Sequence, residues 1–265
     1  MKRLLTAIIV ALSLGGFVVF PTQVLADVSV SVNIGPPALP DYPQPVIPGP
    51  GYLWTPGYWA YGPEGYFWVP GTWVLPPGPG VLWTPGYWGW EVGAYHWHPG
   101  YWGPHVGYYG GVNYGYGYTG HGYEGGYWHG RDFYYNRSVN NVNVTNIHNT
   151  YVKEVVNEPQ GERPSFSGKG GVVDHATSEE QGFEREQHSA PTNEQVQHRE
   201  TAHGRPGQFF TPKNNKPEVA ATRKPGGFTD NDAVRWNPAS KGYNNANRNA
   251  RPAQRQQNKG HPPRH

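Results

Sequence analysis

The residues of this 265-residue chain whose types could do catalytic or metal chemistry are scattered histidines and isolated carboxylates. His96 and His98 are two residues apart and would share one face of a strand. Three further histidines follow in glycine- and tyrosine-rich sequence: His105, His121 and His129. A zinc or copper site needs three or four converging ligands with supporting partners, and this spacing matches no such template. We therefore predict no metal site and no cofactor.

Nucleophilic and acid–base catalysis are also not indicated. The chain has no cysteine, no Gly-x-Ser-x-Gly elbow, no phosphate-binding loop and no His-Glu-x-x-His motif. Glu64, Glu91 and Glu124 each lie in a different turn-like stretch, whereas a glycosidase needs two carboxyl groups facing each other across a cleft. The sequence therefore predicts a protein that is not an enzyme.

The most regular chemistry of the chain is aromatic. One phrase, Trp-x-Pro-Gly-x-Trp, occurs four times, at residues 54–59, 68–73, 83–88 and 97–102. The first and third copies are identical and begin 29 residues apart, which indicates a doubled hairpin unit. The eight tryptophans form either the core of a sheet or an exposed platform whose rings stack on sugars. As candidate ligand-binding residues they are Trp54, Trp59, Trp68, Trp73, Trp83, Trp88, Trp97 and Trp102.

Each phrase also predicts a turn, because Pro followed by Gly is typical of positions i+1 and i+2 of a type II turn, with the glycine at positive φ. The predicted turn residues are Pro56, Gly57, Pro70, Gly71, Pro85, Gly86, Pro99 and Gly100. In the first copy such a hairpin places Thr55 opposite Tyr58 and Trp54 opposite Trp59. Type II turns twist against the ideal two-residue hairpin, so the alternative is that some copies are bends between strands.

The elements that position these rings are predicted to be short antiparallel strands. Turn-like sequence also separates the phrases, at 62–65, 76–80 and 91–94, so turns alternate along the chain as they do in a meander. We predict an all-β fold, a curled sheet or small barrel of aromatic-rich strands, followed by a largely disordered C-terminal tail with one or two short helices.

The two ends of the chain differ in composition from the repeats. Lys2 and Arg3, the apolar run 4–20 and Val24-Leu25-Ala26 before Asp27 predict a signal peptide over residues 1–26, and hence export. After the signal peptide we predict a strand and Pro-rich approach at 27–51, and then the repeat domain with its Gly/Tyr-rich extension at 52–130. An Asn/Val-rich β segment follows at 131–156. Residues 157–204 are predicted to be a charged linker with short helices that start near Thr177 and Pro191, and residues 205–265 a basic disordered tail.

Charge is separated along the chain. Residues 27–130 contain five acids and no Lys or Arg, whereas residues 205–265 contain twelve Lys or Arg and three acids, a formal charge of +9. The expected partner of the basic tail is a cell-wall polysaccharide or an anionic envelope surface. Aromatic residues are sparse in the tail, which argues against specific binding of nucleic acid.

The four phrases resemble those of bacterial proteins with YXWGXW repeats, also called WXXGXW repeats. The similarity extends to residues 45–54, 101–107, 135–142 and 220–226, and so covers most of the chain after the signal peptide. The resemblance implies an exported protein, and it brings no catalytic residue, cofactor or established activity with it.

Two classes of function fit these observations. The first is a noncatalytic structural or interaction protein of the cell envelope, located in the periplasm, at the outer envelope or outside the cell. The second is a carbohydrate- or cell-wall-binding module that uses exposed Trp and Tyr rings. In both, removal of the signal peptide leaves no transmembrane anchor.

Overall fold

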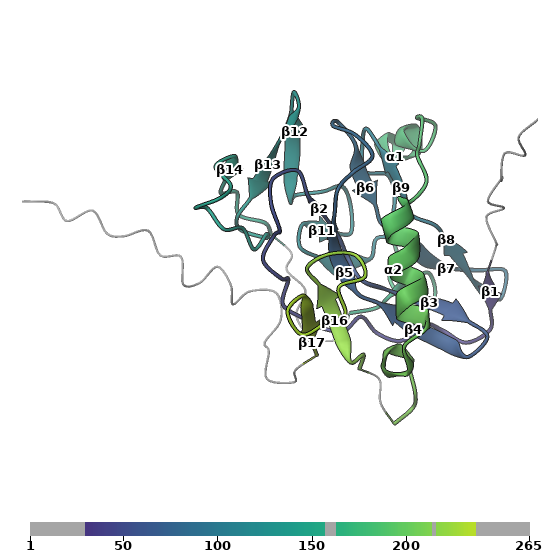
Figure 1. Ribbon diagram of the computed structural model, residues 1–265. Coiled ribbons are helices and arrows are strands. Elements are labelled where there is room, and N and C mark those ends of the chain that lie inside the picture. The colour runs from purple at the N-terminus through teal and green to yellow at the C-terminus, as the bar shows by residue number, and fades with distance from the viewer. Residues whose placement is uncertain (1–29, 157–162, 214–215, 237–265) are drawn as a thin grey trace, which may run out of the picture.

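The computed structural model describes residues 30–156, 163–213 and 216–236 (Figure 1). The predicted signal peptide and residues 237–265 of the basic tail lie outside the described residues. The described chain forms mainly short strands in six small sheets, together with two α-helices. The all-β expectation is confirmed, but none of these six sheets closes into a barrel. Neither of the two described helices is long and apolar enough to cross a membrane.

The first two Trp-x-Pro-Gly-x-Trp phrases form one long hairpin, the first hairpin, over residues 53–74. Strand β2 (Leu53–Thr55) pairs antiparallel with β5 (Gly71–Val74), and β3 (Tyr58–Gly62) pairs antiparallel with β4 (Gly65–Val69). The register runs on unchanged from one pair to the other, so Pro56-Gly57 lies opposite Pro70-Gly71 in the middle of the hairpin.

The third and fourth phrases repeat this arrangement in the second hairpin, residues 82–103. Strand β6 (Leu82–Thr84) pairs with β9 (Tyr101–Gly103), and β7 (Tyr87–Glu91) pairs with β8 (Ala94–His98). The doubled hairpin that the spacing of the identical phrases indicates is therefore present.

The predicted turn position is wrong. Trp54 pairs with Trp73 and not with Trp59, which pairs with Trp68 instead. The chain reverses at 62–65 and 91–94, the linkers between phrases. The Pro-Gly steps are interruptions of the two ladders that do not reverse the chain, because proline cannot donate a ladder hydrogen bond.

Glycine is required in the four phrases because a Cβ would not fit at these positions, and not because the backbone there has positive φ. Positive φ occurs at Gly65 and Gly93, in the true reversals, but at none of the four phrase glycines. A Cβ on Gly86 would lie 2.5 Å from Cζ2 of Trp97 and 2.7 Å from the amide nitrogen of Gly100. The same relation holds in the first hairpin, where the backbones of Gly57 and Gly71 approach each other beneath tryptophan rings.

The cross-strand tryptophan pairs form the centre of the core. Ring centroids lie 5.3 Å apart in the Trp54–Trp73 pair and 5.2 Å apart in the Trp59–Trp68 pair, both edge to face. Such pairs contribute about 0.5–1.5 kcal/mol each beyond the burial of their area. The hydroxyl of Tyr118 links the two hairpins, because it lies 3.3 Å from the main-chain oxygen of Trp54 and 3.1 Å from that of Trp83, the equivalent residue of the second hairpin.

The segments around the repeats complete this core. Strand β1 (Ser31–Val32) pairs with β8, and β15 (Phe166–Ser167) runs parallel to β7. The Pro-rich approach buries Tyr42 and Ile47. The remaining strands between the repeats and the helices are β10 (Asn113–Gly115), β11 (Tyr118–Thr119), β12 (Gly126–His129), β13 (Asp132–Asn136) and β14 (Thr150–Tyr151).

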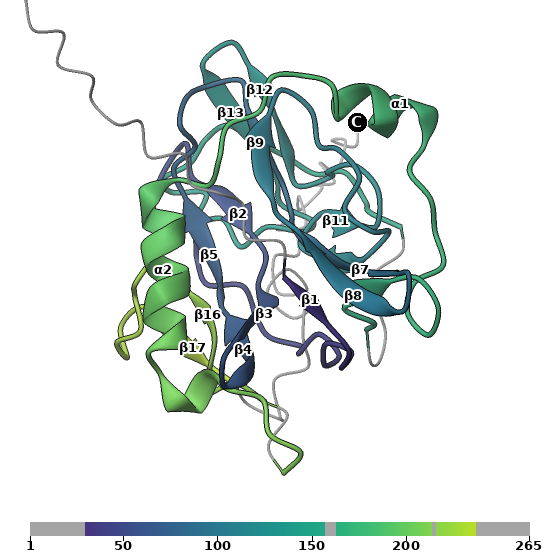
Figure 2. The same cartoon turned by 90° about the vertical axis from the view of Figure 1, so that its right-hand side faces the viewer.

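The two helices form where their capping residues predict them. Helix α1 (Ser178–Phe183) begins after Thr177 and α2 (Asn193–His203) after Thr192, each with a complete capping box. Helix α2 packs beside β4 and runs next to β5 and β16 (Figure 2).

The first part of the basic tail is folded, contrary to the prediction of a disordered segment from residue 205. It contains a short 3₁₀ helix (Pro206–Gln208), β16 (Val219–Thr222) and β17 (Ala233–Arg235). Strand β16 extends the sheet of the first hairpin by pairing parallel with β5, and all four of its residues are buried. A short apolar run can therefore order a polar segment when a strand edge is available for it to pair with.

Candidate ligand-binding groove

The repeat tryptophans do not form the open platform that carbohydrate binding through these rings requires. Seven of the eight are at most 7% exposed. The eighth, Trp97, is half-buried and stacks on Tyr58 with centroids 5.0 Å apart. Several indole N–H groups are also used internally; those of Trp68 and Trp88, for example, donate to main-chain oxygens at 2.9 and 2.8 Å. The platform interpretation of these residues is therefore wrong, and the core interpretation is correct.

The exposed aromatic rings of the chain lie elsewhere. Tyr127 on β12 is 48% exposed and stacks on Tyr134, with centroids 5.5 Å apart and an interplanar angle of 10°. Tyr151 lies on its other flank, at 5.4 Å. Because parallel rings at this distance partly cover one another, this cluster offers no broad flat surface to a sugar.

The candidate histidines and glutamates are dispersed over the fold and do not form a common site. No group of three or more metal-binding side chains converges anywhere in the described chain. A catalytic pair would need two of the three candidate glutamates to face each other, but each of the three contacts a different basic group. Glu64 contacts His203 at 3.1 Å, Glu91 contacts His98 at 3.0 Å, and Glu124 contacts Lys153 at 2.8 Å. The structure does not bring any two of these glutamates onto a common partner.

His121 has the closest set of charged neighbours. Its Nε2 lies 2.5 Å from Asp174 and its Nδ1 lies 2.9 Å from Glu180 at the start of α1. Burial by itself would lower the pKa of His121, but the hydrogen bonds to the two carboxylates outweigh it and raise the pKa. Together with the pairs His105–Glu186 and His203–Glu64, this contact fastens the helical segment to the β domain.

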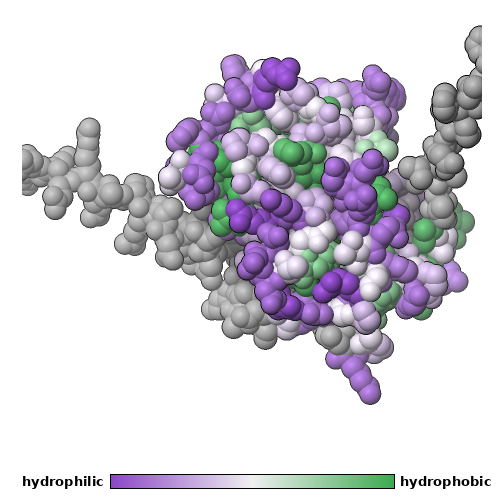
Figure 3. Space-filling view, viewed as in Figure 1, coloured by the Kyte–Doolittle hydropathy of each residue, from purple (hydrophilic) through white to green (hydrophobic). Residues whose placement is uncertain are grey.

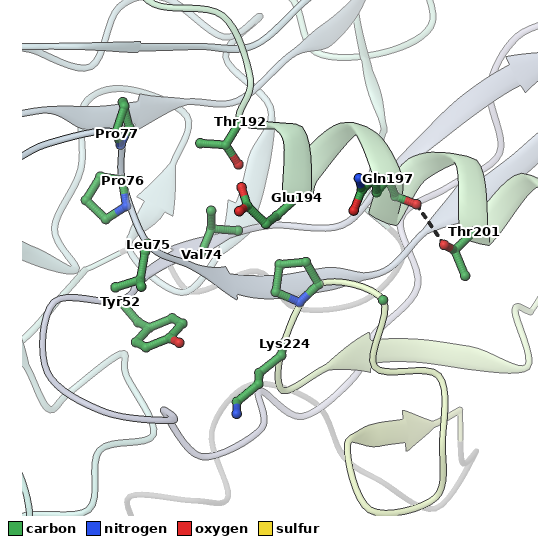
Figure 4. Close-up of a pocket in the computed structure, with 12 residues that line it drawn as sticks. Tyr52, Val74, Leu75, Pro76, Pro77, Thr192, Glu194, Gln197, Thr201 and Lys224 are labelled. Carbon is green, nitrogen blue, oxygen red and sulfur yellow. Dashed lines mark hydrogen bonds between the residues drawn. The ribbon is translucent and has the colours of Figure 1, made fainter.

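A groove of about 590 Å³ lies where the first hairpin, α2 and the folded part of the tail meet (Figure 4). The face of the molecule on which α2 lies is mainly hydrophilic, with small separated apolar patches (Figure 3). The residues that line the groove come from three parts of the chain: Val74 at the end of the first hairpin with the flanking Tyr52 and Leu75 to Pro77, the N-cap Thr192 with Glu194, Gln197 and Thr201 of α2, and Lys224, Pro225 and Gly226 from the loop after β16.

The wall of the groove that α2 forms is polar, because three polar residues are spaced so that they lie on the same face of the helix. Glu194, Gln197 and Thr201 follow one another at steps of three and four residues, which places them on one face of α2. Within the described residues, Glu194 and Lys224 take part in no ion pair, although both line the groove. The groove thus presents one carboxylate, one ammonium group and one amide, beside the rings of Tyr52 and three prolines.

A buried histidine joins the three walls. His198 of α2 donates from Nε2 to the main-chain oxygen of Pro70 at 2.9 Å, and its Nδ1 accepts from the amide of Gly226 at 2.9 Å. The ring must be neutral to do both, because a protonated imidazole has no acceptor. Burial lowers the pKa of His198 to about 4, although its bond to the Pro70 oxygen acts in the opposite direction. The groove is therefore held in shape near neutral pH.

Sequence reasoning missed the groove because its walls are far apart in the chain. One signal was present in the sequence. Residues 220–226, which include most of β16 and Lys224, resemble the same repeat proteins as the tryptophan phrases do, although the surrounding sequence is polar. A segment similar to a repeat family but lying outside the repeats could have been expected to pack against them.

The comparisons agree with the repeat pattern. The WXXGXW repeat family matches the chain in two copies, at residues 49–74 and 78–102. Each copy coincides with one hairpin, so the structural unit contains two of the four tryptophan phrases. No curated protein and no solved structure matches the chain. Residues 49–74 and 78–102 of the chain are thus two copies of the WXXGXW repeat.

Proposed function

We propose that this WXXGXW repeat protein is an exported, noncatalytic interaction protein of the cell envelope, and that its C-terminal basic segment contacts an anionic polymer or surface. The observation that carries the proposal is the separation of charge: no Lys or Arg in residues 27–130, and a formal +9 in residues 205–265. Long-range attraction by such a segment needs no fixed pocket on the partner.

The position of the folded tail supports this role. Five of the six cations in the described part of this segment are exposed: Lys213, Lys216, Arg223, Lys224 and Arg235. Strand β16 is fixed to the first hairpin through β5, so these cations are attached to the body of the protein by main-chain pairing. The two cation–π contacts of the segment also stay within it, between Arg205 and Phe228 and between Lys216 and Trp236.

The test compares the full chain with a chain that ends at Trp236. A chain ending at Gly204 is not suitable, because it would remove β16 and uncover the edge of β5. Residues 237–265 hold six Lys or Arg and no acid. We expect their removal to weaken cosedimentation with purified peptidoglycan or with phosphatidylglycerol vesicles, and the two materials identify the source of the negative charge.

The dependence of binding on salt concentration distinguishes the loss of positive charge from the other effects of truncation. Binding of the full chain should weaken steeply between about 50 and 200 mM salt, because the contact is between exposed charges. A full-length variant with those six cations changed to Gln is the matched control and should behave like the truncated chain. Equal binding by all three proteins, with the same salt response, would refute the proposal.

A further inference from the structure

We propose that the groove between α2, the Leu75–Pro77 segment and the Lys224–Gly226 loop binds a saccharide that carries a carboxylate. None of the residues that line this groove comes after Trp236, and the proposed site does not depend on whether the tail contacts an anionic surface.

The hairpin wall of the groove is apolar and is open to solvent. Leu75 is 52% exposed, although it directly follows the buried Val74 at the end of β5. Pro76, Pro77 and the ring of Tyr52 adjoin it (Figure 4). Rigid rings of this kind pack against the C–H face of a pyranose with little loss of conformational entropy.

The opposite wall supplies hydrogen-bonding groups over the length of a short saccharide. Glu194 and Thr201 are seven residues apart on α2, a distance of about 10 Å along the helix axis. Gln197 lies between them with an amide that both donates and accepts. The hydroxyl of Thr201 donates to the main-chain oxygen of Gln197 at 2.7 Å, so it is left to act as an acceptor.

The end of α2 is not itself the binding element. The Thr192 hydroxyl accepts from the Gln195 amide, and the Gln195 side chain accepts from the Thr192 amide at 2.8 Å. These contacts satisfy the helix start without a ligand. The interaction with a ligand therefore depends on the side chains that point into the groove.

Charge decides the class of saccharide. Lys224 approaches the groove from the loop, on the side away from α2, and Glu194 approaches from the helix (Figure 4). A ligand carboxylate placed at Lys224 gains a charge-assisted hydrogen bond, while a ligand hydroxyl can donate to Glu194. A neutral saccharide would leave the ammonium group without a partner, and a carboxylate at the helical wall would be repelled by Glu194.

A proline-rich peptide is the competing occupant, and the groove fits it less well. Strand β5 is already paired on both sides, with β2 and with β16, so a peptide cannot add to it as a further strand. Recognition of a polyproline helix requires a groove lined by aromatic rings, and Tyr52 is the one aromatic residue among those that line this groove.

The experiment measures binding of matched disaccharides to the full-length protein by isothermal titration calorimetry at neutral pH. The acidic probe is the disaccharide of N-acetylglucosamine and N-acetylmuramic acid, and the neutral probe is di-N-acetylchitobiose, which lacks the lactyl carboxylate. Digalacturonic acid is a second acidic probe, and a proline-rich decapeptide represents the competing class. We expect both acidic sugars to bind at least about tenfold more tightly than the neutral one.

Two variants locate the site. Lys224→Gln should abolish the preference for the acidic probes, because it removes the ammonium group proposed to contact the ligand carboxylate, and it should leave the fold intact, since Lys224 is exposed and takes part in no ion pair within the described residues. Lys169→Gln is the control with the same loss of charge at an exposed position outside the groove, and it should retain the preference. Thermal melting confirms that both variants are folded.

Three results would overturn the inference: no binding of either acidic sugar, equal affinity for the acidic and neutral probes, or a preference that survives Lys224→Gln. Binding of the peptide alone would also overturn it and would identify the groove as a peptide site. A chain ending at Trp236 should retain saccharide binding, which distinguishes this site from the proposed contact through the tail.

Discussion

The substitution Gly86→Ala tests why glycine follows proline in the middle of each hairpin. The added Cβ would lie 2.5 Å from Cζ2 of Trp97, 2.7 Å from the amide nitrogen of Gly100 and 2.8 Å from the main-chain oxygen of His98. Two of these three atoms belong to the backbone of the facing strand and cannot turn away as a flexible side chain can. The hairpin must therefore widen at this point, or the Trp88–Trp97 pair must shift.

The expected cost follows from inserting a methyl group into a packed core. Overpacking of this kind typically costs about 1–3 kcal/mol, and sometimes more. A folded body of this size loses about 2–4 °C in melting temperature for each kcal/mol. We therefore expect Gly86→Ala to lower the melting temperature by about 2–12 °C, measured by tryptophan fluorescence or circular dichroism.

Comparison of Ala with Asn separates lack of space from backbone conformation. Gly93 is at φ +87 with nothing within 4 Å of a Cβ, so Asn, which tolerates positive φ, should be accepted there at least as well as Ala. At Gly86 the order should reverse, because Asn is larger and φ is not positive. Gly49→Ala, which has neither constraint, is the baseline. If Asn is better tolerated than Ala at Gly86, the argument from close approach is wrong.

Four further predictions concern links between segments. Tyr118→Phe, which removes the hydroxyl shared by the two hairpins, should cost about 1–3 kcal/mol in the free energy of urea unfolding. His198 has a lowered pKa in the fold, so its contribution to the free energy of unfolding is present above its ordinary pKa of 6.5 and should be lost as the pH falls from 6.5 to about 4. Melting curves over this pH range should show the loss. The variant His198→Gln should remove this dependence of stability on pH. The pKa of His121 is raised in the fold, so its contribution to stability is present below pH 6.5 and should be lost as the pH rises through the folded-state pKa. In His121→Gln the melting temperature should change less over this rise in pH. The effect is reduced by solvent screening, because the side chain is 41% exposed. A chain ending at Gly204 should be less soluble and less stable than one ending at Trp236 in parallel gel-filtration and melting experiments, because it lacks β16 and leaves β5 with an open edge.

The parts of the fold that depend on local sequence could be predicted. The identical phrases at 54–59 and 83–88 indicated two equivalent hairpins, and alternation along the strands placed the tryptophans on a common face. Thr177 and Pro191 indicated where the helices start, and α1 and α2 begin within two residues of them, since the signals that start a helix are local. Each of these inferences used residues within a few positions of one another.

The location of the turns could not be predicted in the same way, because two local signals compete. Pro56-Gly57 and the stretch 62–65 both favour a reversal of the chain, and only pairing across the hairpin decides between them. Reversal at 62–65 brings Trp54 opposite Trp73 and Trp59 opposite Trp68 in one register. Reversal at every Pro-Gly step would also give two pairs of facing tryptophans, Trp54 with Trp59 and Trp68 with Trp73, so the local sequence leaves both registers open.

The position of the groove follows from the use of the repeats as core. Tryptophans that are buried by their partners cannot contact a ligand, so the saccharide site proposed above uses residues at the margin of the hairpins. At that margin Tyr52 belongs to the first repeat copy and Leu75 directly follows it, whereas Glu194, Gln197 and Lys224 come from segments that are joined to the repeat through His198. If the proposed site is correct, substitutions in α2 or in the Lys224 loop should therefore change ligand affinity without disturbing the tryptophan core, whereas substitutions within the phrases should act first on stability.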